Sequence, residues 1–175
     1  MEENLFKNSL IENFVIFRHG KAQRPFDADD DFSRNLVERG IKEAKSQAQR
    51  LFEIGFAPDI VLVSSANRAF QTWQAAKEIF PNSEELITRD LYLASPNIYW
   101  QHVIDTKAKN VMLIAHDPGL HDLCRYFLKG NDETIDAHYL AADLPTAGIA
   151  WFQRDSKIKS GMKLISHLRP IKSAD

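Results

Sequence analysis

One short segment constrains the fold of this 175-residue chain more than any other: the apolar run Phe14-Val15-Ile16-Phe17, followed directly by Arg18-His19-Gly20. Consecutive apolar residues of this kind predict a strand buried in the interior of a sheet. The glycine permits a sharp turn and lets another group approach His19 without meeting a Cβ atom. Because ligands of open α/β sheets bind beyond the carboxyl ends of the strands, Arg18 and His19 are predicted to lie where a ligand binds.

Two further apolar runs end in the same way. Residues 60–63 predict a second buried strand, and Arg68 follows in the first turn of the next predicted helix. Residues 111–115 predict a third buried strand, which ends directly in His116. Because the carboxyl ends of parallel strands meet at one edge of a sheet, we expect four side chains to converge there: Arg18, His19, Arg68 and His116.

The rest of the chain alternates between helical and strand patterns. Apolar residues at helical spacing predict helices over about 38–54, 69–80, 96–105 and 120–128. Apolar runs predict a short strand near Leu86 and Ile87 and two closing strands over 149–153 and 162–168, whereas residues 131–146 are polar and predict irregular structure. The expected fold is α/β, a three-layer αβα sandwich with a largely parallel central sheet covered on both faces.

Composition narrows the class of protein. The length predicts one domain over residues 1–175, with residues 1–12 as a loosely ordered leader. A net charge of −2 without a dense Lys/Arg block gives no support to a nucleic-acid or membrane partner. The single cysteine, Cys124, excludes an internal disulfide and is expected to be buried. No signal segment or apolar span is visible near the amino terminus, so a cytoplasmic location is expected.

The four converging residues predict an anion site. Two arginines fixed beside two imidazoles, near the amino ends of helices, suit a dianion such as phosphate. Histidine in such a site can carry a proton or attack phosphorus as a nucleophile. Taken singly, His116 could simply cap a strand end and Arg68 could be a solvated helix residue. Their shared position after buried strands favours a single site.

The loop after the first strand is acidic, with Asp27, Asp29, Asp30 and Asp31. Such a run usually forms a solvated surface. A calcium loop is the alternative, but the glycine and the closing glutamate of an EF-hand are missing at their required offsets. The sequence leaves open whether residues 27–31 contact a substrate.

At the converging residues the chain resembles the histidine phosphatase superfamily, the phosphoglycerate-mutase-like phosphatases, and within it the SixA-like phosphohistidine phosphatases. The matching segments are residues 17–22 (FRHGKA), 63–72 (VSSANRAFQT) and 114–120 (IAHDPGL), with residues 144–148 (LPTAG) as a late turn on the phosphate side. The resemblance implies a phosphoglycerate-mutase-like fold. It also implies a phosphatase that needs no metal and no organic cofactor.

The resemblance assigns a role to each residue. His19 would be the nucleophile that becomes phosphorylated, and Arg18, Arg68 and His116 would bind the phosphoryl group. Thr146 and Gly148 would contribute to substrate binding. Expected partners are a phosphorylated protein or a small phosphate ester, with inorganic phosphate as the product.

The proton donor to the leaving group is the least certain part of this interpretation. Candidates are Glu84, Glu85, Asp90 and Asp117, although an Asp before Pro at a helix start is more often an N-cap. A positioned acid contributes roughly 10²–10⁴ in rate when an alkoxide must leave. Imidazole, with a pKa of about 6.5 when protonated, leaves more readily. A phosphohistidine protein is therefore the favoured substrate, with a small-molecule phosphomonoesterase and a non-catalytic phosphate-binding module as the alternatives.

Overall fold

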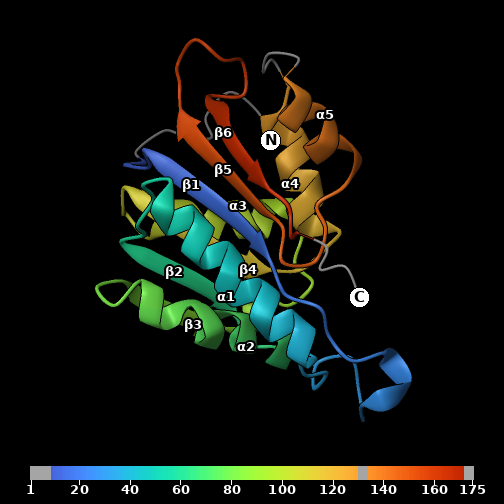
Figure 1. Cartoon of the computed structure of the whole chain (residues 1–175). Helices are drawn as coiled ribbons and strands as arrows, with labels where there is room; N and C mark the ends of the chain where they lie inside the picture. The colour runs from blue at the N-terminus through green and yellow to red at the C-terminus, as the bar shows by residue number, and fades with distance from the viewer. Residues whose placement is uncertain (1–8, 130–133, 172–175) are drawn as a thin grey trace.

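The computed structural model describes residues 9–129 and 134–171 (Figure 1). Its strands are β1 (Asn13–Arg18), β2 (Ile60–Ser64), β3 (Glu84–Thr88), β4 (Asn110–Ala115), β5 (Ile149–Arg154) and β6 (Met162–Leu168). Its α-helices are α1 (Glu38–Glu53), α2 (Asn67–Ala76), α3 (Pro96–Asp105), α4 (Gly119–Phe127) and α5 (Ile135–Ala142). Short 3₁₀ helices are η1 (Pro25–Asp27), η2 (Lys77–Ile79) and η3 (Arg89–Leu91).

The strands form one six-stranded sheet in the order β3-β2-β4-β1-β5-β6. Strands β3, β2, β4 and β1 run parallel, whereas β5 pairs antiparallel with both β1 and β6. The sheet is therefore mixed, because β5 runs opposite to the other five strands. Apolar runs predicted β5 and β6 as strands, but an apolar run carries no information about the direction of a strand.

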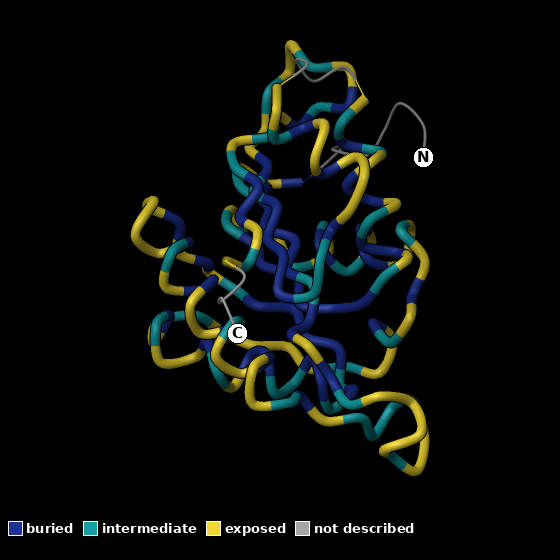
Figure 2. The backbone as a smooth tube through the Cα atoms, turned by 45° about the vertical axis from the view of Figure 1, so that its right-hand side comes forward, coloured by how far each residue is buried: buried dark blue, intermediate teal, exposed yellow. Residues whose placement is uncertain are grey.

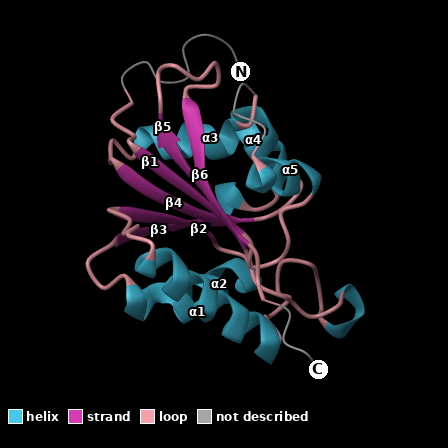
Figure 3. Ribbon diagram, turned by 45° about the horizontal axis from the view of Figure 1, so that its top comes forward, coloured by secondary structure: helices cyan, strands magenta, loops and turns pink. Residues whose placement is uncertain are grey.

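Helices cover both faces of this sheet, as Figure 3 shows: α1 and α2 lie on one side, and α3, α4 and α5 lie on the other. Side chains of a strand point alternately to the two faces. In β1, Phe14 and Ile16 therefore join the core under α3, α4 and α5, while Val15 and Phe17 join the core under α1 and α2. Because each face is covered, β1 has no exposed apolar residue, and the buried backbone concentrates at the centre of the molecule (Figure 2).

The turn after β1 is packed against the start of α1. A Cβ atom on Gly20 would lie 2.6 Å from the Gly40 carbonyl oxygen, and one on Gly40 would lie 2.1 Å from the Lys21 carbonyl oxygen. Both distances are impossible for real atoms, so two glycines are required where these backbones meet. The sequence predicted that Gly20 lets another group approach His19, and that group is the backbone of α1 at Gly40.

Several predictions about elements are confirmed and others are wrong. The strands that precede His19 and His116, the helix over 38–54 and the burial of Cys124 are confirmed. Residues 131–146 are not wholly irregular, because α5 occupies Ile135–Ala142, where the Thr134 side chain accepts a hydrogen bond from the Ala137 N–H at 3.1 Å. The leader prediction fails for residues 9–12, since Ile11 is in the core; residues 1–8 lie outside the described part of the chain.

None of the helices in the described ranges has both the length and the apolar character that crossing a membrane requires.

Candidate active site

The register of the central strands brings two histidines together. Arg18 of β1 lies opposite Ala115 of β4, and the His19 N–H donates to the Ala115 carbonyl at 3.1 Å. His19 and His116 thus leave neighbouring parallel strands side by side, with their ring centroids 5.1 Å apart. The two histidines are neighbours because β1 and β4 pair in register along their whole length and end at the same level of the sheet.

Arg68 joins them from the first turn of α2. Strand β2 is the other neighbour of β4, so the helix that follows it begins at the same edge of the sheet. A pocket of about 450 Å³ lies there. Its lining residues are Arg18, His19, Lys21, Ala22, Asp31, Arg34, Arg68, Leu93, His116, Asp117 and Thr146. All four residues that the sequence placed at one edge line this pocket.

His19 is held with one ring nitrogen free of a proton. Its Nδ1 lies 2.8 Å from the Gly20 carbonyl oxygen, which can only accept, so Nδ1 carries the hydrogen. Its Nε2 accepts a hydrogen bond from Arg68 Nε at 3.2 Å. Burial, together with the positive charges of Arg68 and Arg18, lowers the pKa of His19 to about 3 against the opposing effect of the Gly20 carbonyl. His19 is therefore neutral at physiological pH, with a lone pair on Nε2.

His116 is held neutral from the other side of the pocket. Its Nε2 lies 2.7 Å from Ser64 Oγ, while the Ser64 Oγ also accepts from the Ala66 N–H at 3.4 Å. A hydroxyl can donate one hydrogen bond and accept two, so Ser64 satisfies His116 Nε2 in either imidazole tautomer. Burial, and the neighbouring His19 and Arg68, lower the pKa of His116 to about 2. Its Nδ1 is buried and has no hydrogen-bond partner among the described residues.

Arg18 and Asp117 form an ion pair at the rim of the pocket. Arg18 Nη1 lies 2.7 Å from Asp117 Oδ2 and also donates to the Leu144 carbonyl at 2.6 Å. Burial raises the pKa of Asp117 although Arg18 opposes this shift. Arg18 Nε and Asp117 Oδ1 are buried without a hydrogen-bond partner in the described ranges. Buried polar atoms are almost always paired, so these two and His116 Nδ1 mark a place where a polar ligand fits.

The structure corrects the preferred interpretation of Asp117. Helix α4 begins at Gly119 with Pro118 as its N-cap residue, and the Asp117 side chain pairs with Arg18. The backbone of His121, in the first turn of α4, also opposes the rise in the Asp117 pKa. The other candidate acids do not line the pocket. The Asp90 side chain is 73% exposed, and its Oδ2 lies 3.8 Å from His102 Nε2. Glu84 and Glu85 lie on the edge strand β3.

The sequence left open whether the acidic loop reaches the site, and the fold brings one of its residues, Asp31, into the pocket. Asp31, from the acidic loop, accepts hydrogen bonds from Arg68 through both its backbone carbonyl and its Oδ2, the latter at 2.9 Å. It also accepts from the Tyr92 hydroxyl at 2.6 Å and from Arg34 Nη1 at 2.8 Å. Burial alone would raise the pKa of Asp31, but these three donors outweigh it and hold the pKa well below its usual range. Asp31 is a carboxylate that fixes the Arg68 guanidinium.

The late turn predicted to bind substrate is placed partly in the pocket. Thr146 lines it, whereas Gly148 is buried beneath it and does not. The turn instead holds the end of β1: the Ala147 N–H donates to the His19 carbonyl at 3.0 Å, and the Gly148 carbonyl accepts from the Arg18 N–H at 3.0 Å. Gly148 thus contacts the backbone that carries the site.

Two other acids of the loop have partners of their own. Asp27 pairs with Arg24 at 3.3 Å, and Asp30 accepts from the Ser33 N–H at 2.7 Å. In the ranges that the structure describes, no three His, Cys, Asp or Glu side chains are grouped so that they could hold a metal ion.

Comparison with known proteins finds partial sequence matches to a phosphatase and a phosphoglycerate mutase. No protein-family model matches the chain. Over 78 residues it is 33% identical to the serine/threonine-protein phosphatase Pgam5 of Drosophila grimshawi, and over 62 residues it is 42% identical to the 2,3-bisphosphoglycerate-dependent phosphoglycerate mutase of Pasteurella multocida. These segments cover 41% and 33% of this chain, and 26% of each relative. The chain therefore aligns with about a quarter of the length of these curated relatives.

A solved structure matches over nearly the whole chain. The Agrobacterium tumefaciens protein described as a phosphohistidine phosphatase SixA superposes with a TM-score of 0.79 at 27% identity, covering 91% of this chain and 99% of that one. The resemblance to SixA-like histidine phosphatases is confirmed. Like that structure, the SixA-like chain has a mixed α/β fold, and the two share almost their full length.

Proposed function

We propose that this SixA-like chain is a phosphatase that transfers a phosphoryl group to His19 and then to water, acting on phosphohistidine in a protein. One observation carries the proposal: His19 Nε2 is unprotonated and accepts from Arg68, while Nδ1–H is bonded to the Gly20 carbonyl. A nucleophilic imidazole needs this tautomer. The ring can attack without first losing a proton, once the Arg68 N–H moves from Nε2 to a phosphoryl oxygen.

The reaction then has two balanced steps. His19 Nε2 attacks phosphorus as the bond from phosphorus to the leaving nitrogen breaks, and the leaving imidazole takes up a proton from solvent. Water next attacks phosphorus, the bond from phosphorus to Nε2 breaks, and one proton of the water returns to solvent. Hydrogen phosphate then leaves, and neutral His19 is restored. Splitting one hydrolysis in this way replaces one difficult step with two easier ones.

The charge that develops on phosphoryl oxygens meets donors that are already in place. Arg18 Nε and His116 Nδ1 are buried and unpartnered within the described chain, and both residues line the pocket. Each Nη atom of Arg68 keeps a second hydrogen beyond the one that it gives to Asp31. Fixed donors of this kind stabilise the transition state without reorganising. They do the work that magnesium does in many other phosphoryl-transfer sites.

The chemistry of the leaving group supports phosphohistidine as the substrate. Imidazole leaves near neutral pH without a strong acid, because its conjugate acid has a pKa of about 6.5. The pocket opens beside Lys21 and Leu93, which are both exposed, so a side chain that protrudes from another protein could enter. The Agrobacterium tumefaciens protein, which this chain resembles at 27% identity, is named for the same substrate class.

A small-molecule phosphomonoesterase is the second candidate, and Asp117 is the observation that favours it. Its Oδ1 is buried beside Arg18 in the pocket, and burial raises its pKa, as a proton donor requires. The rates of hydrolysis of a phosphohistidine peptide and of an alkyl phosphate, measured in the unaltered protein and in Asp117→Asn, distinguish the two functions. Faster hydrolysis of the alkyl phosphate, lost in Asp117→Asn, would contradict the preferred substrate.

Trapping the intermediate tests the reaction itself. Acid-labile label from a ³²P-phosphohistidine peptide should appear on His19 after rapid quenching and should be absent in His19→Ala. His121→Ala, which removes another histidine outside the pocket, is the control and should keep the label. Tight phosphate binding without any covalent label would instead favour a non-catalytic phosphate-binding module.

The remaining expectations form part of the same proposal. A single histidine-phosphatase domain spans residues 1–175, and the helices on both faces of the sheet correspond to the three-layer αβα arrangement. The enzyme uses no metal and no cofactor, has no nucleic-acid or membrane partner and works in the cytoplasm. Support for these statements comes from the charge, the composition and the fixed cations of the pocket.

A further inference from the structure

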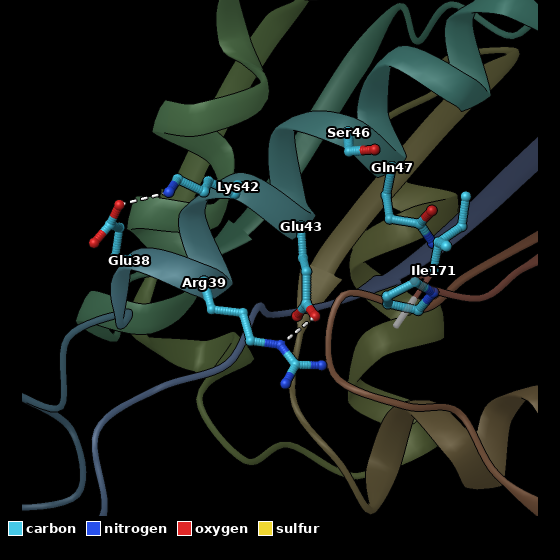
Figure 4. A pocket seen from close by; sticks show the side chains of 8 residues that line it. Glu38, Arg39, Lys42, Glu43, Ser46, Gln47 and Ile171 are labelled. Carbon is cyan, nitrogen blue, oxygen red and sulfur yellow. Dashed lines mark hydrogen bonds and ion pairs between the residues drawn. The ribbon is translucent and has the colours of Figure 1, made fainter. Parts of the chain in front are cut away.

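Two more hollows continue the active-site pocket across the surface. A hollow of about 190 Å³ shares Lys21 and Thr146 with the active-site pocket. The same hollow shares Arg39, Glu43 and Pro170 with an outer pocket of about 410 Å³ (Figure 4). The three hollows therefore lie next to one another, from His19 to the exposed face of α1, and together we call them the α1 groove.

The walls of the α1 groove are fixed by hydrogen bonds. One wall is α1, and the other is the segment Arg169 to Ile171 that follows β6. Gln47 Nε2 donates to the Leu168 carbonyl at 2.9 Å, and Arg50 Nη1 donates to the Arg169 carbonyl at 2.8 Å. Figure 4 shows Gln47 extending from α1 beside Ile171. Because these bonds hold the second wall against the helix, the groove exists before any ligand arrives.

The charge of the α1 groove is opposite to that of the whole chain. Its middle part contains three cations, Lys21, Arg39 and Arg169, and a single carboxylate, Glu43. Arg169 Nη2 also lies 4.0 Å from Asp143 Oδ2, so the net charge is +1 when this carboxylate is counted. Glu43 is paired with Arg39 at 2.7 Å, and its side chain is only 13% exposed. The chain as a whole carries a net charge of −2. A local excess of positive charge on an acidic protein attracts an acidic partner.

The size of the α1 groove suits a stretch of polypeptide. From Arg39 to Gln47, α1 rises about 12 Å at 1.5 Å per residue. An extended chain spans this distance with about four residues.

We propose that the α1 groove binds the polypeptide that carries the phosphohistidine, and that it selects substrates with Asp or Glu a few residues from the phosphorylated side chain. The inference rests on the proposed function, because it assumes that the phosphoryl donor is a protein. Arg39 and Arg169 act as specificity-determining residues. They lie outside the active-site pocket and contact the flanking residues of the substrate.

Kinetics with two peptides test this inference. The peptides share a length and a central phosphohistidine, and they carry either Asp and Glu or Asn and Gln at the flanking positions. Exposed ion pairs contribute about 0.2–1 kcal/mol each, so Arg39→Gln/Arg169→Gln should raise KM for the acidic peptide about threefold to tenfold. The kcat for that peptide should not change. The KM for the neutral peptide and for phosphoramidate, which has the phosphorus–nitrogen bond without a polypeptide, should also stay the same.

The control variant is Lys45→Gln/Lys163→Gln. It removes the same charge from two exposed positions outside the α1 groove, so a loss of general electrostatic attraction would appear in both variants. Equal KM values of the two peptides in the unaltered protein, or equal effects of the two double variants, would overturn the groove proposal alone. A protein that hydrolyses phosphoramidate but neither peptide would overturn the proposed protein substrate, and the groove proposal with it.

Discussion

Arg68 links His19 to Asp31, and the arrangement of the pocket depends on the shape of its guanidinium group. Its side chain is 3% exposed and donates at the same time to His19 Nε2 and to Asp31. Only a planar guanidinium reaches these partners together, because lysine concentrates its charge on one nitrogen. We expect Arg68→Lys to lower kcat at least about 10²-fold, the usual loss when a preorganised donor is removed. Steady-state hydrolysis of a phosphohistidine peptide measures this.

The exposed Arg24, whose side chain is 84% accessible, gives the matched control Arg24→Lys, which should leave kcat unchanged. If Arg68→Lys retained normal turnover while circular dichroism showed a folded protein, the guanidinium geometry would have no part in catalysis.

Asp31 acts through Arg68, and its removal should affect kcat and KM differently. Asp31→Asn removes the charge that holds the Arg68 guanidinium, and hydrogen bonds to charged groups contribute about 1.5–3 kcal/mol. We expect kcat to fall about tenfold or more, whereas KM should not rise, because the pocket loses a negative charge next to an anionic substrate. Tyr92→Phe removes a single neutral donor to the same carboxylate and should give a smaller loss of kcat. A rise in KM with normal kcat would contradict the positioning role.

At the level of elements, the contact between the β1 exit and α1 is the most sensitive to substitution. In Gly40→Ala, the new Cβ would meet the Lys21 carbonyl at 2.1 Å, so the first turn of α1 must move away from the strand that carries His19. Overpacking of this kind costs about 1–3 kcal/mol. We expect urea denaturation to show this loss and kcat to fall as well. Ser46→Ala, at an exposed position of the same helix, should be neutral or slightly stabilising, because alanine favours helix.

The sequence was most informative about elements with a strong apolar period. Helix α1 and strands β1, β2 and β4 were predictable because each buries an apolar stripe or a continuous apolar run. Helix α5 was missed because its polar and apolar residues do not form a clear stripe. The reversed direction of β5 could not be predicted, because an alternation with a period of two is the same in either direction.

The candidate site was predictable only where it depends on strand ends. His19 and His116 follow buried runs directly, so their proximity could be inferred from chain order. Asp31 lies in a long loop, and its contact with Arg68, 37 residues later, arises only when that loop folds back over the pocket. Whether Asp117 caps α4 or pairs with Arg18 likewise depends on contacts between elements that no local pattern records.

At the level of the whole molecule, buried neutral histidines make stability depend on pH. Burial lowers the pKa values of His19 to about 3 and of His116 to about 2, while the same groups titrate near 6.5 in the unfolded chain. Below pH 6.5 the unfolded state therefore binds more protons than the native state, and stability falls as the pH falls. Between pH 7 and pH 5 we expect each of the two to lower the free energy of unfolding by on the order of 2 kcal/mol. Urea titrations at the two pH values measure the sum.

His167 gives a test of this effect away from the active site. It is buried on β6 near Arg169, Asp136 and Asp143, and burial lowers its pKa to about 4. His167→Leu should therefore reduce the loss of stability between pH 7 and pH 5 without changing kcat. Asp117, whose pKa is raised by burial, acts in the opposite direction at acidic pH. Equal stability of the unaltered protein at pH 7 and pH 5 would mean that His19 and His116 are not buried as neutral groups.

Strand β1 lies far along the sequence from both of its neighbours in the sheet, β4 and β5. It ends at Arg18, whereas β4 begins at Asn110 and β5 begins at Ile149. During synthesis its apolar residues must wait for partners about a hundred residues away, and closing such loops costs entropy before any contact compensates for it. Segments left unpaired in this way are the ones most exposed to aggregation during folding. Since β4 and the turn before β5 hold His19 in place, a nascent chain can position this proposed nucleophile only after that turn has left the ribosome.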